Sequence, residues 1–378
     1  MADNHAVVVA GRRIQAVVPY DELDSSIGRI DLTGRLLAPG FLDLQVNGGG
    51  GQLFSNSPDT DTLRLICRAH RKSGTTALLP TLISGNVKAM QAAIAAVHSA
   101  MESQIPGVVG IHLEGPYISV HRRGIHQERH ILPIETDALD LMSSLTVGTT
   151  LVTLAPECAP LGAIARLVGS NTLVAIGHSD ATYEQALAAL EEGACGFTHL
   201  FNGMAPLQSR HPGCLGAGLN DERSWIGIIA DGHHVHPANL RIALSTKPKG
   251  KVILVSDATA AAQCEISEFA WNGQTIYVKD GLCVLADGTL AGSTTTLLDA
   301  VSYLVKQLDL PLEEALRMAS TYPAIAIGRS DEFGYIRRGN AANLVLLDEA
   351  LDVVETWVDG IRYTFFEKNG CSDDEQKI

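Results

Sequence analysis

The sequence is poor in charged residues, and basic residues are scarcer than acidic ones. Only 19% of its 378 residues are charged and 46% are hydrophobic, whereas charged residues make up about 25% of an average protein. A chain this apolar buries a large core, which excludes a mostly disordered protein. The 42 acidic and 28 basic residues give a net charge of −14. We expect no nucleic-acid partner, because phosphate backbones bind basic faces.

The sequence also lacks the signatures of disulfide-bonded, secreted and membrane proteins. Its seven cysteines are scattered and include no C-x-x-C pair, which excludes a zinc ribbon and a disulfide framework. No apolar run approaches the ~20 residues that span a bilayer. The N-terminus has neither the basic region nor the apolar region of a signal peptide. We therefore expect a cytoplasmic protein without membrane contact.

The middle of the chain alternates between two patterns. Eight apolar runs end in polar or glycine residues, at 41–47, 76–81, 108–114, 150–157, 172–178, 196–202, 225–231 and 251–257. Helical stretches follow at 60–73, 86–103, 135–145, 159–169, 182–193 and 237–245. Nearly continuous apolar runs are typical of parallel strands covered on both faces. Eight such units predict a (β/α)8 TIM-type barrel.

The flanking segments predict additional elements. After the eighth run we expect a hairpin at 271–284 and closing helices at 295–308 and 312–328, while 203–223 shows no clear helix. Both chain ends contain short strand patterns, and each end alone is too small to bury a core. We therefore expect one small β-sandwich domain from residues 1–39 and 339–367, a barrel over 40–338, and a flexible tail over 368–378.

Three polar residues at the ends of separate strands suggest a metal site. Glu114 ends the third run, His178 ends the fifth run and His199 lies within the sixth. The C-terminal ends of barrel strands meet at one rim. One carboxylate and two imidazoles suit a divalent ion with an open position for water. Any one of these histidines alone is better read as a satisfied rim residue. Zinc fits this set best, and iron, cobalt and manganese also fit it.

Asp257 ends the eighth run and points into the same loop face. A carboxylate there would take a proton from an activated water and return it to a leaving amine. The alternative is an N-cap of the following turn. Arginines and histidines in nearby loops would form an anion pocket, or simply solvated faces; they include Arg122, Arg123, His126, Arg129, His130, Arg210, His211, Arg223, His233, His234 and His236.

Three motifs suggest other chemistry. Residues 177–181 nearly match the nucleophile elbow G-x-S-x-G around Ser179, but an acid and then a histidine must follow, and no histidine follows His236. Residues 126–130 have the two histidines of H-E-x-x-H, with Gln127 in place of the general base. The glycines at 48–51 lack the spacing of a dinucleotide fingerprint. The Ser179 hydrolase stays open as an alternative.

Seven segments carry a resemblance to a known family. Residues 38–48 resemble the first-strand signature of the amidohydrolase superfamily. The motifs HLEGP, GHSDAT, THLFN, ADGHHV, SDAT and TLAGS, beginning at 112, 177, 198, 230, 256 and 289, resemble the N-acetylglucosamine-6-phosphate deacetylases of that superfamily. The resemblance extends over about residues 6–363. It implies hydrolysis of N-acetyl-D-glucosamine 6-phosphate to D-glucosamine 6-phosphate and acetate, in amino-sugar catabolism and recycling.

The resemblance also implies a role for each matching residue. Glu114, His178 and His199 would bind the metal, Asp257 would be the general base and acid, and His126 would polarise the acetyl carbonyl. Substrate would contact Ile125, His126, Asn202, Gly203, Arg210, Asp231, His234, Leu290, Ala291, Gly292 and Ser293. The family resemblance further implies a homodimer, in which Arg210 would serve either its own site or the partner's.

One departure from the superfamily pattern concerns the first strand. Gln45 and Asn47 stand where many members carry the two histidines of H-x-H, which hold a second metal. Amides are poor ligands for transition metals, so we expect one ion per subunit, with Gln45 and Asn47 as neighbours of its water. The other interpretations left open are a different amidohydrolase reaction, such as cyclic-amide hydrolysis or deamination, and a non-catalytic sugar-phosphate sensor.

Overall fold

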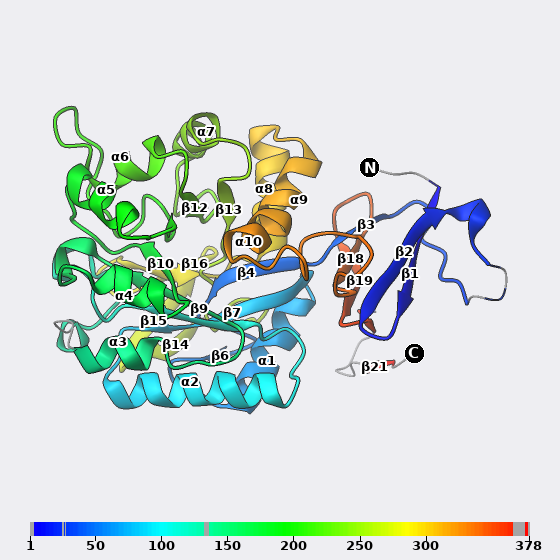
Figure 1. Ribbon diagram of the computed structural model, residues 1–378, viewed down its shortest axis with the longest axis horizontal. Helices are drawn as coiled ribbons and strands as arrows, with labels where there is room; N and C mark the ends of the chain where they lie inside the picture. The colour runs from blue at the N-terminus through cyan, green and yellow to red at the C-terminus, as the bar shows by residue number, and fades with distance from the viewer. Residues whose placement is uncertain (1–3, 25, 27, 132–135, 366–374, 377–378) are drawn as a thin grey trace.

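A computed structural model describes the chain except residues 1–3, 25, 27, 132–135, 366–374 and 377–378 (Figure 1). Its centre is a parallel sheet in the order β13-β12-β11-β10-β9-β8-β7-β4. The eight strands are β4 (Phe41–Val46), β7 (Thr75–Ile83), β8 (Gly110–Glu114), β9 (Thr149–Leu154), β10 (Leu173–Ile176), β11 (Gly196–Phe197), β12 (Trp225–Ile228) and β13 (Val252–Leu254). All of these strands are buried, apart from partial exposure of the first residue of β10. The eight-unit barrel expected from the sequence is confirmed.

The barrel closes between its first and last strands. The main-chain N–H of Asp257 donates to the carbonyl of Gln45 (3.0 Å), and that of Asn47 donates to the carbonyl of Ala258 (2.9 Å). A parallel bridge joins Val46 to Ala258. The residues that close the barrel therefore flank Asp257 and fix it at the C-terminal rim.

Helices cover the barrel, as Figure 1 shows. They are α1 (Thr60–Arg71), α2 (Val87–Glu102), α3 (Thr136–Met142), α4 (Ala163–Gly169), α5 (Tyr183–Glu191), α6 (Gly213–Asn220), α7 (Pro237–Thr246), α8 (Leu297–Leu308), α9 (Leu312–Ala319) and α10 (Thr321–Ala326). Short 3-10 turns lie at η1 (Tyr20–Glu22), η2 (Val120–Arg122), η3 (Glu128–His130) and η4 (Pro156–Cys158). Helix α5 begins with a capping box of Thr182 and Gln185, as its sequence indicates. The helix expected at 312–328 is two helices, α9 and α10, separated at Ser320.

Helix α6 contradicts the expectation that 203–223 holds no helix. Its sequence contains three glycines, which weaken a helix by about 1 kcal/mol each relative to alanine. The helix is largely buried, and a Cβ at Gly218 would lie 2.7 Å from Leu200. Tertiary packing therefore selects glycine for close contact and overrides its low helix propensity.

Strands from both chain ends build small sheets beside the barrel. In the five-stranded sheet, β3 (Leu36–Pro39) pairs with β18 (Leu344–Leu347), followed by β19 (Val353–Val358), β20 (Ile361–Thr364) and β21 (Glu375–Gln376). The hairpin of β1 (His5–Ala10) and β2 (Arg13–Pro19) contributes Ile14, which packs on Leu344, Leu346 and Trp357. Of the expected tail 368–378, only Glu375–Gln376 are described, as β21; the rest lies outside the described residues.

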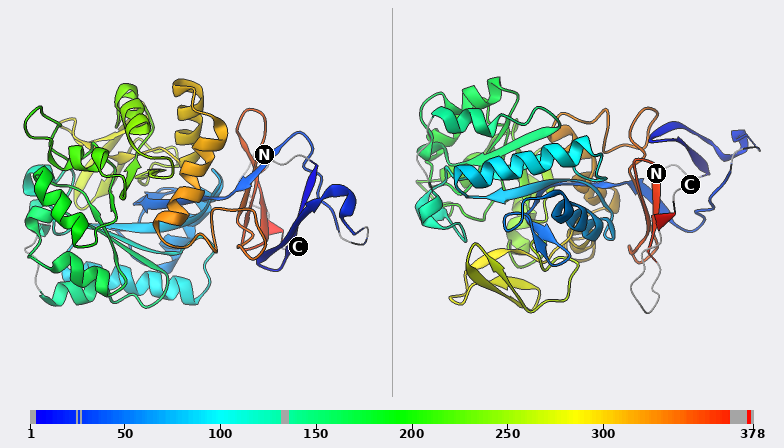
Figure 2. Two further views of the ribbon diagram at one scale, coloured as in Figure 1. Left: turned by 45° about the horizontal axis from the view of Figure 1, so that its top comes forward. Right: turned by 90° about the horizontal axis from the view of Figure 1, so that it is seen from below.

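Two further strand groups lie near the rim. The expected hairpin is part of a four-stranded antiparallel sheet, made of β14 (Glu268–Trp271), β15 (Gln274–Lys279), β16 (Leu282–Val284) and β17 (Leu290–Ser293). Figure 2 (right) shows this yellow sheet projecting from the barrel. A short ribbon of β5 (Gly48–Gly49) and β6 (Gln52–Leu53) follows β4.

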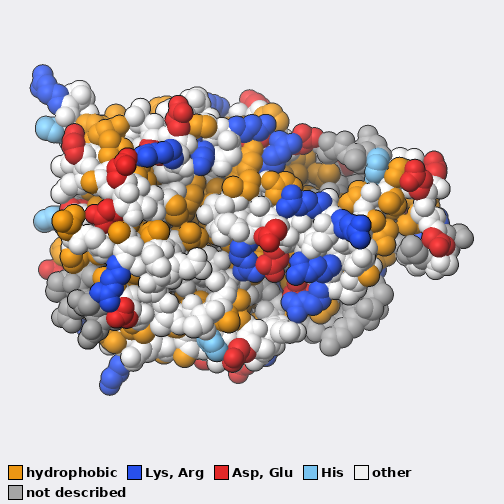
Figure 3. Space-filling model, viewed as in Figure 1, with side chains coloured by type: hydrophobic (Ala, Val, Ile, Leu, Met, Phe, Trp, Pro, Cys, Tyr) orange, Lys and Arg blue, Asp and Glu red, His pale blue; other side chains and the backbone are white. Residues whose placement is uncertain are grey.

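Acidic and basic side chains are interspersed on the face drawn in Figure 3. None of the helices in the described part of the chain has the length and apolarity needed to cross a bilayer.

Candidate metal centre

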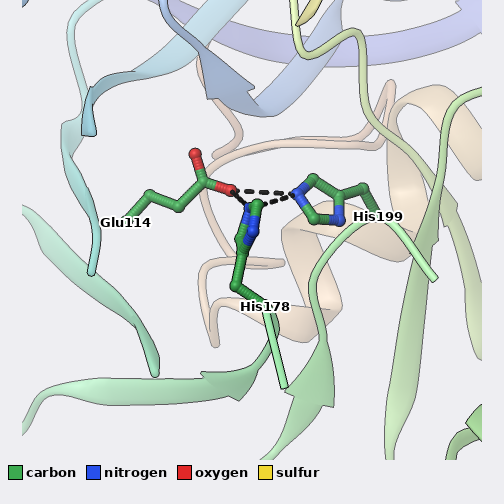
Figure 4. A group of neighbouring side chains, drawn as sticks. All are labelled: Glu114, His178 and His199. Carbon is green, nitrogen blue, oxygen red and sulfur yellow. Dashed lines mark hydrogen bonds and ion pairs between the residues drawn. The ribbon is translucent and has the colours of Figure 1, made fainter. Parts of the chain in front are cut away.

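Three side chains from different strand ends converge at the rim of the barrel. Oε1 of Glu114 lies 3.0 Å from Nε2 of His199 and 3.2 Å from Nε2 of His178, and the two imidazole nitrogens are 3.1 Å apart (Figure 4). All three residues are buried. Glu114 ends β8, His178 follows β10 and His199 follows β11. The structure therefore brings together the three ligands expected from the sequence.

These atoms fit a divalent cation. In a tetrahedral site with bonds of about 2.0–2.2 Å, neighbouring ligand atoms are about 3.3–3.6 Å apart, a few tenths of an ångström more than the separations in this cluster. Nδ1 of His178 lies 2.7 Å from the carbonyl oxygen of Arg122, which fixes the ring with Nε2 toward the cluster. Burial raises the pKa of Glu114, but hydrogen bonds from His178 and His199 outweigh it and hold that pKa well below its usual range. The carboxylate is therefore ionised, as a metal ligand must be.

Gln45 and Asn47 turn their amide nitrogens toward the acidic residues. Nε2 of Gln45 donates to Oε1 of Glu114 and to Oδ1 of Asp257, both at 3.0 Å. Nδ2 of Asn47 donates to the same oxygen of Asp257 at 2.7 Å. Their buried carbonyl oxygens accept no hydrogen bond within the described structure. The two amides therefore bind carboxylates through their nitrogens.

Asp257 lies directly beside the metal cluster. Burial, and then the negative charge of Glu114, raise the pKa of Asp257 to about 6. Its carbonyl accepts the N–H of Ser293 in β17 (2.9 Å). A Cβ at Gly292 would lie 2.9 Å from the same carbonyl. The structure thus places the segment 290–293, which includes the exposed Leu290 and the buried Ala291, next to the expected general base.

His126 faces the cluster from the loop after β8. Its Nε2 lies 3.9 Å from Oε2 of Glu114, and its ring centre lies 4.5 Å from that of His178. On the other side of the ring, Nδ1 contacts Ser84. Burial lowers the pKa of His126 to about 3, so the ring is neutral. The neighbouring Ile125 is buried, and its carbonyl accepts a hydrogen bond from Gln274.

Asp231 and His234 form a pair after β12. Nδ1 of His234 lies 2.6 Å from Oδ2 of Asp231, and the N–H groups of His233 and His234 donate to Oδ1. These bonds occupy both carboxylate oxygens. Nε2 of His234 is buried and has no partner in the described part of the chain. Within the described residues Nε2 of His234 is thus unpaired, and Asp231 fixes the orientation of its ring.

Asn202, Gly203 and Arg210, the other residues expected to bind substrate, have fewer contacts with the metal cluster. Asn202 donates from Nδ2 to the carbonyl of His199 (3.3 Å), and the carbonyl of Gly203 accepts the N–H of Ser179 (3.0 Å). Arg210 is exposed on the loop before α6 and makes no contact with this cluster within the described residues. Two other candidate cations are engaged in ion pairs, Arg122 with Asp180 and Arg223 with Asp221 and Glu191.

Known family models cover nearly the whole chain. The model of the amidohydrolase family matches residues 36–366, and the model of the NagA composite domain matches residues 1–37. The chain belongs to the amidohydrolase family. This membership agrees with the convergence of Glu114, His178 and His199, because an open site with N and O ligands is what metal-assisted hydrolysis requires.

Similar proteins within the amidohydrolase family share a class of substrate in their names. An N-acetylgalactosamine-6-phosphate deacetylase of Shewanella sp. is 42% identical, and the match covers 87% of this chain and 83% of that protein. The structure of N-acetylglucosamine-6-phosphate deacetylase from Pasteurella multocida superposes with a TM-score of 0.93 at 37% identity, covering 96% of both chains. The Mycobacterium smegmatis enzyme, a mutant in complex with N-acetyl-D-glucosamine-6-phosphate, has a TM-score of 0.85 at 31% identity and covers 94% and 93%.

The contacts of Ser179 do not fit the nucleophile-elbow interpretation. Ser179 is buried, its hydroxyl donates to Oε2 of Glu157 (2.7 Å), and the N–H of Asp180 donates to the other oxygen of that carboxylate (2.6 Å). A serine hydrogen-bonded to a carboxylate in place of a histidine has no general base of the usual kind. Ser179 instead ties down the loop that carries His178.

Sequence analysis missed two groups that support the site. Ser84 was outside the expected strand, which ended at Thr81, whereas β7 continues to Ile83. Glu157 is the last residue of the apolar run 150–157, and its carboxylate accepts hydrogen bonds from the loop at Ser179. Both residues could have been found from their position in the sequence. Each follows the C-terminal end of a strand, where barrel enzymes place their catalytic residues.

Proposed function

We propose that this chain hydrolyses the acetamide bond of N-acetyl-D-glucosamine 6-phosphate to give D-glucosamine 6-phosphate and acetate, in amino-sugar catabolism. The observation that carries the proposal is the buried cluster of Glu114, His178 and His199 next to Asp257. The names of the similar deacetylases support this substrate class. Since metal-assisted hydrolysis acts on linear and cyclic amides alike, the names of these relatives are what favours a linear acetamide on a phosphorylated sugar.

One divalent ion per subunit, zinc before iron, cobalt or manganese, fits Glu114, His178 and His199. Such an ion supplies Lewis acidity, which lowers the pKa of water and polarises a carbonyl. The Gln45 and Asn47 amides hold Oδ1 of Asp257, so that Oδ2 is the oxygen that exchanges protons.

Asp257 and His126 have different roles: Asp257 transfers the proton and His126 stabilises the acetyl oxygen. Asp257 accepts a proton as water attacks the acetyl carbon, and it returns that proton to the amine nitrogen as the C–N bond breaks. His126 donates a hydrogen bond to the acetyl oxygen, where negative charge develops. Asp231 orients His234 toward the sugar phosphate.

The rim loops complete substrate binding in this proposal. The main-chain segments at Ile125, Asn202, Gly203 and 290–293 line the sugar, and Arg210 binds the phosphate in a homodimer, from its own subunit or the partner's. The exposure of Arg210 within a single chain supports a role at a subunit boundary. A cytoplasmic location fits a phosphorylated substrate, because the charge of the phosphate keeps sugar phosphates inside cells.

Acetate release measured with four substrates tests the proposal. They are the 6-phosphates of N-acetylglucosamine and N-acetylgalactosamine and the two unphosphorylated sugars. We expect kcat/KM for the phosphorylated glucosamine to exceed that for its unphosphorylated form by at least about 100-fold, since a charge-assisted contact contributes ~3 kcal/mol. The Shewanella relative makes N-acetylgalactosamine 6-phosphate the second candidate substrate. A higher kcat/KM with that sugar would identify it as the substrate in place of its glucosamine epimer. Binding of both phosphates without acetate release would indicate a sensor.

A further inference from the structure

The side of the His126 ring that faces away from Glu114 contacts Ser84. The hydroxyl oxygen of Ser84 lies 2.7 Å from Nδ1 of His126, and the main-chain N–H of Ser84 donates to the same nitrogen at 3.3 Å. Both residues are buried, with 1% of each exposed. Ser84 follows β7 directly, so a barrel strand fixes its position.

These contacts decide which ring nitrogen carries hydrogen. A main-chain N–H can only donate, so Nδ1 of His126 must be an acceptor and carries no hydrogen. The hydroxyl of Ser84 then also donates to Nδ1, because two acceptors do not form a hydrogen bond. In a neutral imidazole the hydrogen is therefore on Nε2, the nitrogen 3.9 Å from Oε2 of Glu114.

The position of this hydrogen matters because His126 is the third histidine at the cluster. A histidine with a bare Nε2 this close to Glu114 and His178 would be a further metal ligand, since metals bind the unprotonated ring nitrogen. That ligand would fill the position that a hydrolytic site keeps open for water and substrate. A hydrogen on Nε2 prevents this coordination and gives the ring a donor.

We propose that Ser84 is a positioning residue that holds His126 with its hydrogen on Nε2, so that the ring donates to the acetyl oxygen of the substrate and stays off the metal. This inference rests on the proposed deacetylase function for the substrate part. The position of the hydrogen itself follows from the contacts of Ser84 and can be measured without turnover.

Long-range proton–nitrogen NMR correlations of the histidine rings in the zinc-loaded protein give that measurement. The His126 signals are assigned by their absence in His126→Asn. We expect the pattern of an Nε2–H ring in the wild type and a larger share of the Nδ1–H form in Ser84→Ala, which loses the shorter of the two bonds. An Nδ1–H ring, or a metal-bound Nε2, in the wild-type protein would overturn the proposal.

A double-mutant cycle in kcat tests whether Ser84 acts through His126. We expect His126→Asn to lower kcat by about 10²–10³-fold, as loss of one oxyanion donor does, and Ser84→Ala to lower it less, with KM and zinc content unchanged. The double variant should match His126→Asn alone. Equal losses from Ser84→Ala with and without His126, or no loss with His126 present, would contradict the proposal.

Two control variants separate positioning from folding. Ser84→Thr keeps the hydroxyl and should restore most of kcat. Ser73→Ala removes a buried hydroxyl at the opposite end of β7, where it donates to the carbonyl of His70, and should leave kcat and the ring pattern unchanged. If the wild-type protein releases no acetate, the deacetylase proposal fails, whereas the NMR result still decides the role of Ser84.

Discussion

The amide nitrogen of Asn47 lies 2.7 Å from Oδ1 of Asp257. The resemblance to the amidohydrolase superfamily implies a metal-binding histidine at this position, and Asn47 there donates a hydrogen bond to the candidate general base. Gln45 donates to the same oxygen. The first barrel strand therefore orients the carboxylate that follows the eighth strand.

Asp257→Asn tests whether that carboxylate carries the protons. We expect kcat to fall by about 10²–10⁴-fold, the usual contribution of a general acid–base group, because an amide cannot accept the proton from water. The metal ligands are untouched, so metal content and binding of the sugar phosphate should persist. Metal analysis, isothermal titration calorimetry and acetate release check this, and near-normal turnover would refute the role.

Asn47→Ala is expected to shift the acid limb of the kcat/KM profile to higher pH. Asp257 must be ionised to accept a proton, and the amide of Asn47 lowers its pKa by donating to the ionised form. Losing a hydrogen bond to a charged group costs about 1.5–3 kcal/mol, or roughly one to two pH units. Asn220→Ala, which removes an exposed bond to Tyr183, is the matched control. A limb that stays in place would show that Asn47 does not govern Asp257.

The barrel was predictable because its strands are unusually regular in sequence. Runs covered on both faces are largely apolar, so β12 could be located from hydrophobicity alone. Strands β4 and β9 also contain Asp43, Gln45 and threonines, and the apolar residues between them still mark each run. Helix α6 could not be located in this way, since the contact between Gly218 and Leu200 that justifies its glycines exists only after folding. For the same reason the strand β17 was not expected, because its pairing partners include the main chain near Asp257.

The site divides in the same way. The ligands could be listed from strand ends, because the topology of a barrel brings those ends together whatever their separation in sequence. The direction of each hydrogen bond could not be predicted: Gln45 donates to two carboxylates, and Asp231 binds His234 with both of its oxygens. Side-chain orientation depends on packing that no local sequence pattern encodes.

Asp180→Asn is expected to weaken metal binding from outside the ligand set. Asp180 binds Nε of Arg122 at 2.5 Å, and the carbonyl of Arg122 contacts Nδ1 of the ligand His178. Loss of a group that hydrogen-bonds a ligand directly reduces metal affinity by about 10–100-fold, and Asp180 acts one contact further out, so we expect a decrease of about tenfold or less. Competition with a chromogenic zinc chelator measures the affinity. Asp140→Asn, which breaks an exposed pair with Arg166, should leave it unchanged; equal affinities in both variants would contradict the prediction.

Arg210→Ala is expected to raise KM for the 6-phosphate sugar far more than for the unphosphorylated sugar, because its charge would bind the phosphate. If Arg210 serves the partner's site, mixing this variant with Asp257→Asn should restore activity, since mixed dimers contain one complete site. If it serves its own site, mixing restores nothing. Parallel KM changes for both sugars would show that Arg210 does not bind the phosphate.

Metal stoichiometry tests the central claim most directly. Protein stripped with a chelator is titrated with zinc while acetate release from N-acetyl-D-glucosamine 6-phosphate is followed. One ion held by Glu114, His178 and His199 predicts a linear rise that ends at about one equivalent per chain. Full activity in the stripped protein, or a rise that continues to two equivalents, would contradict it.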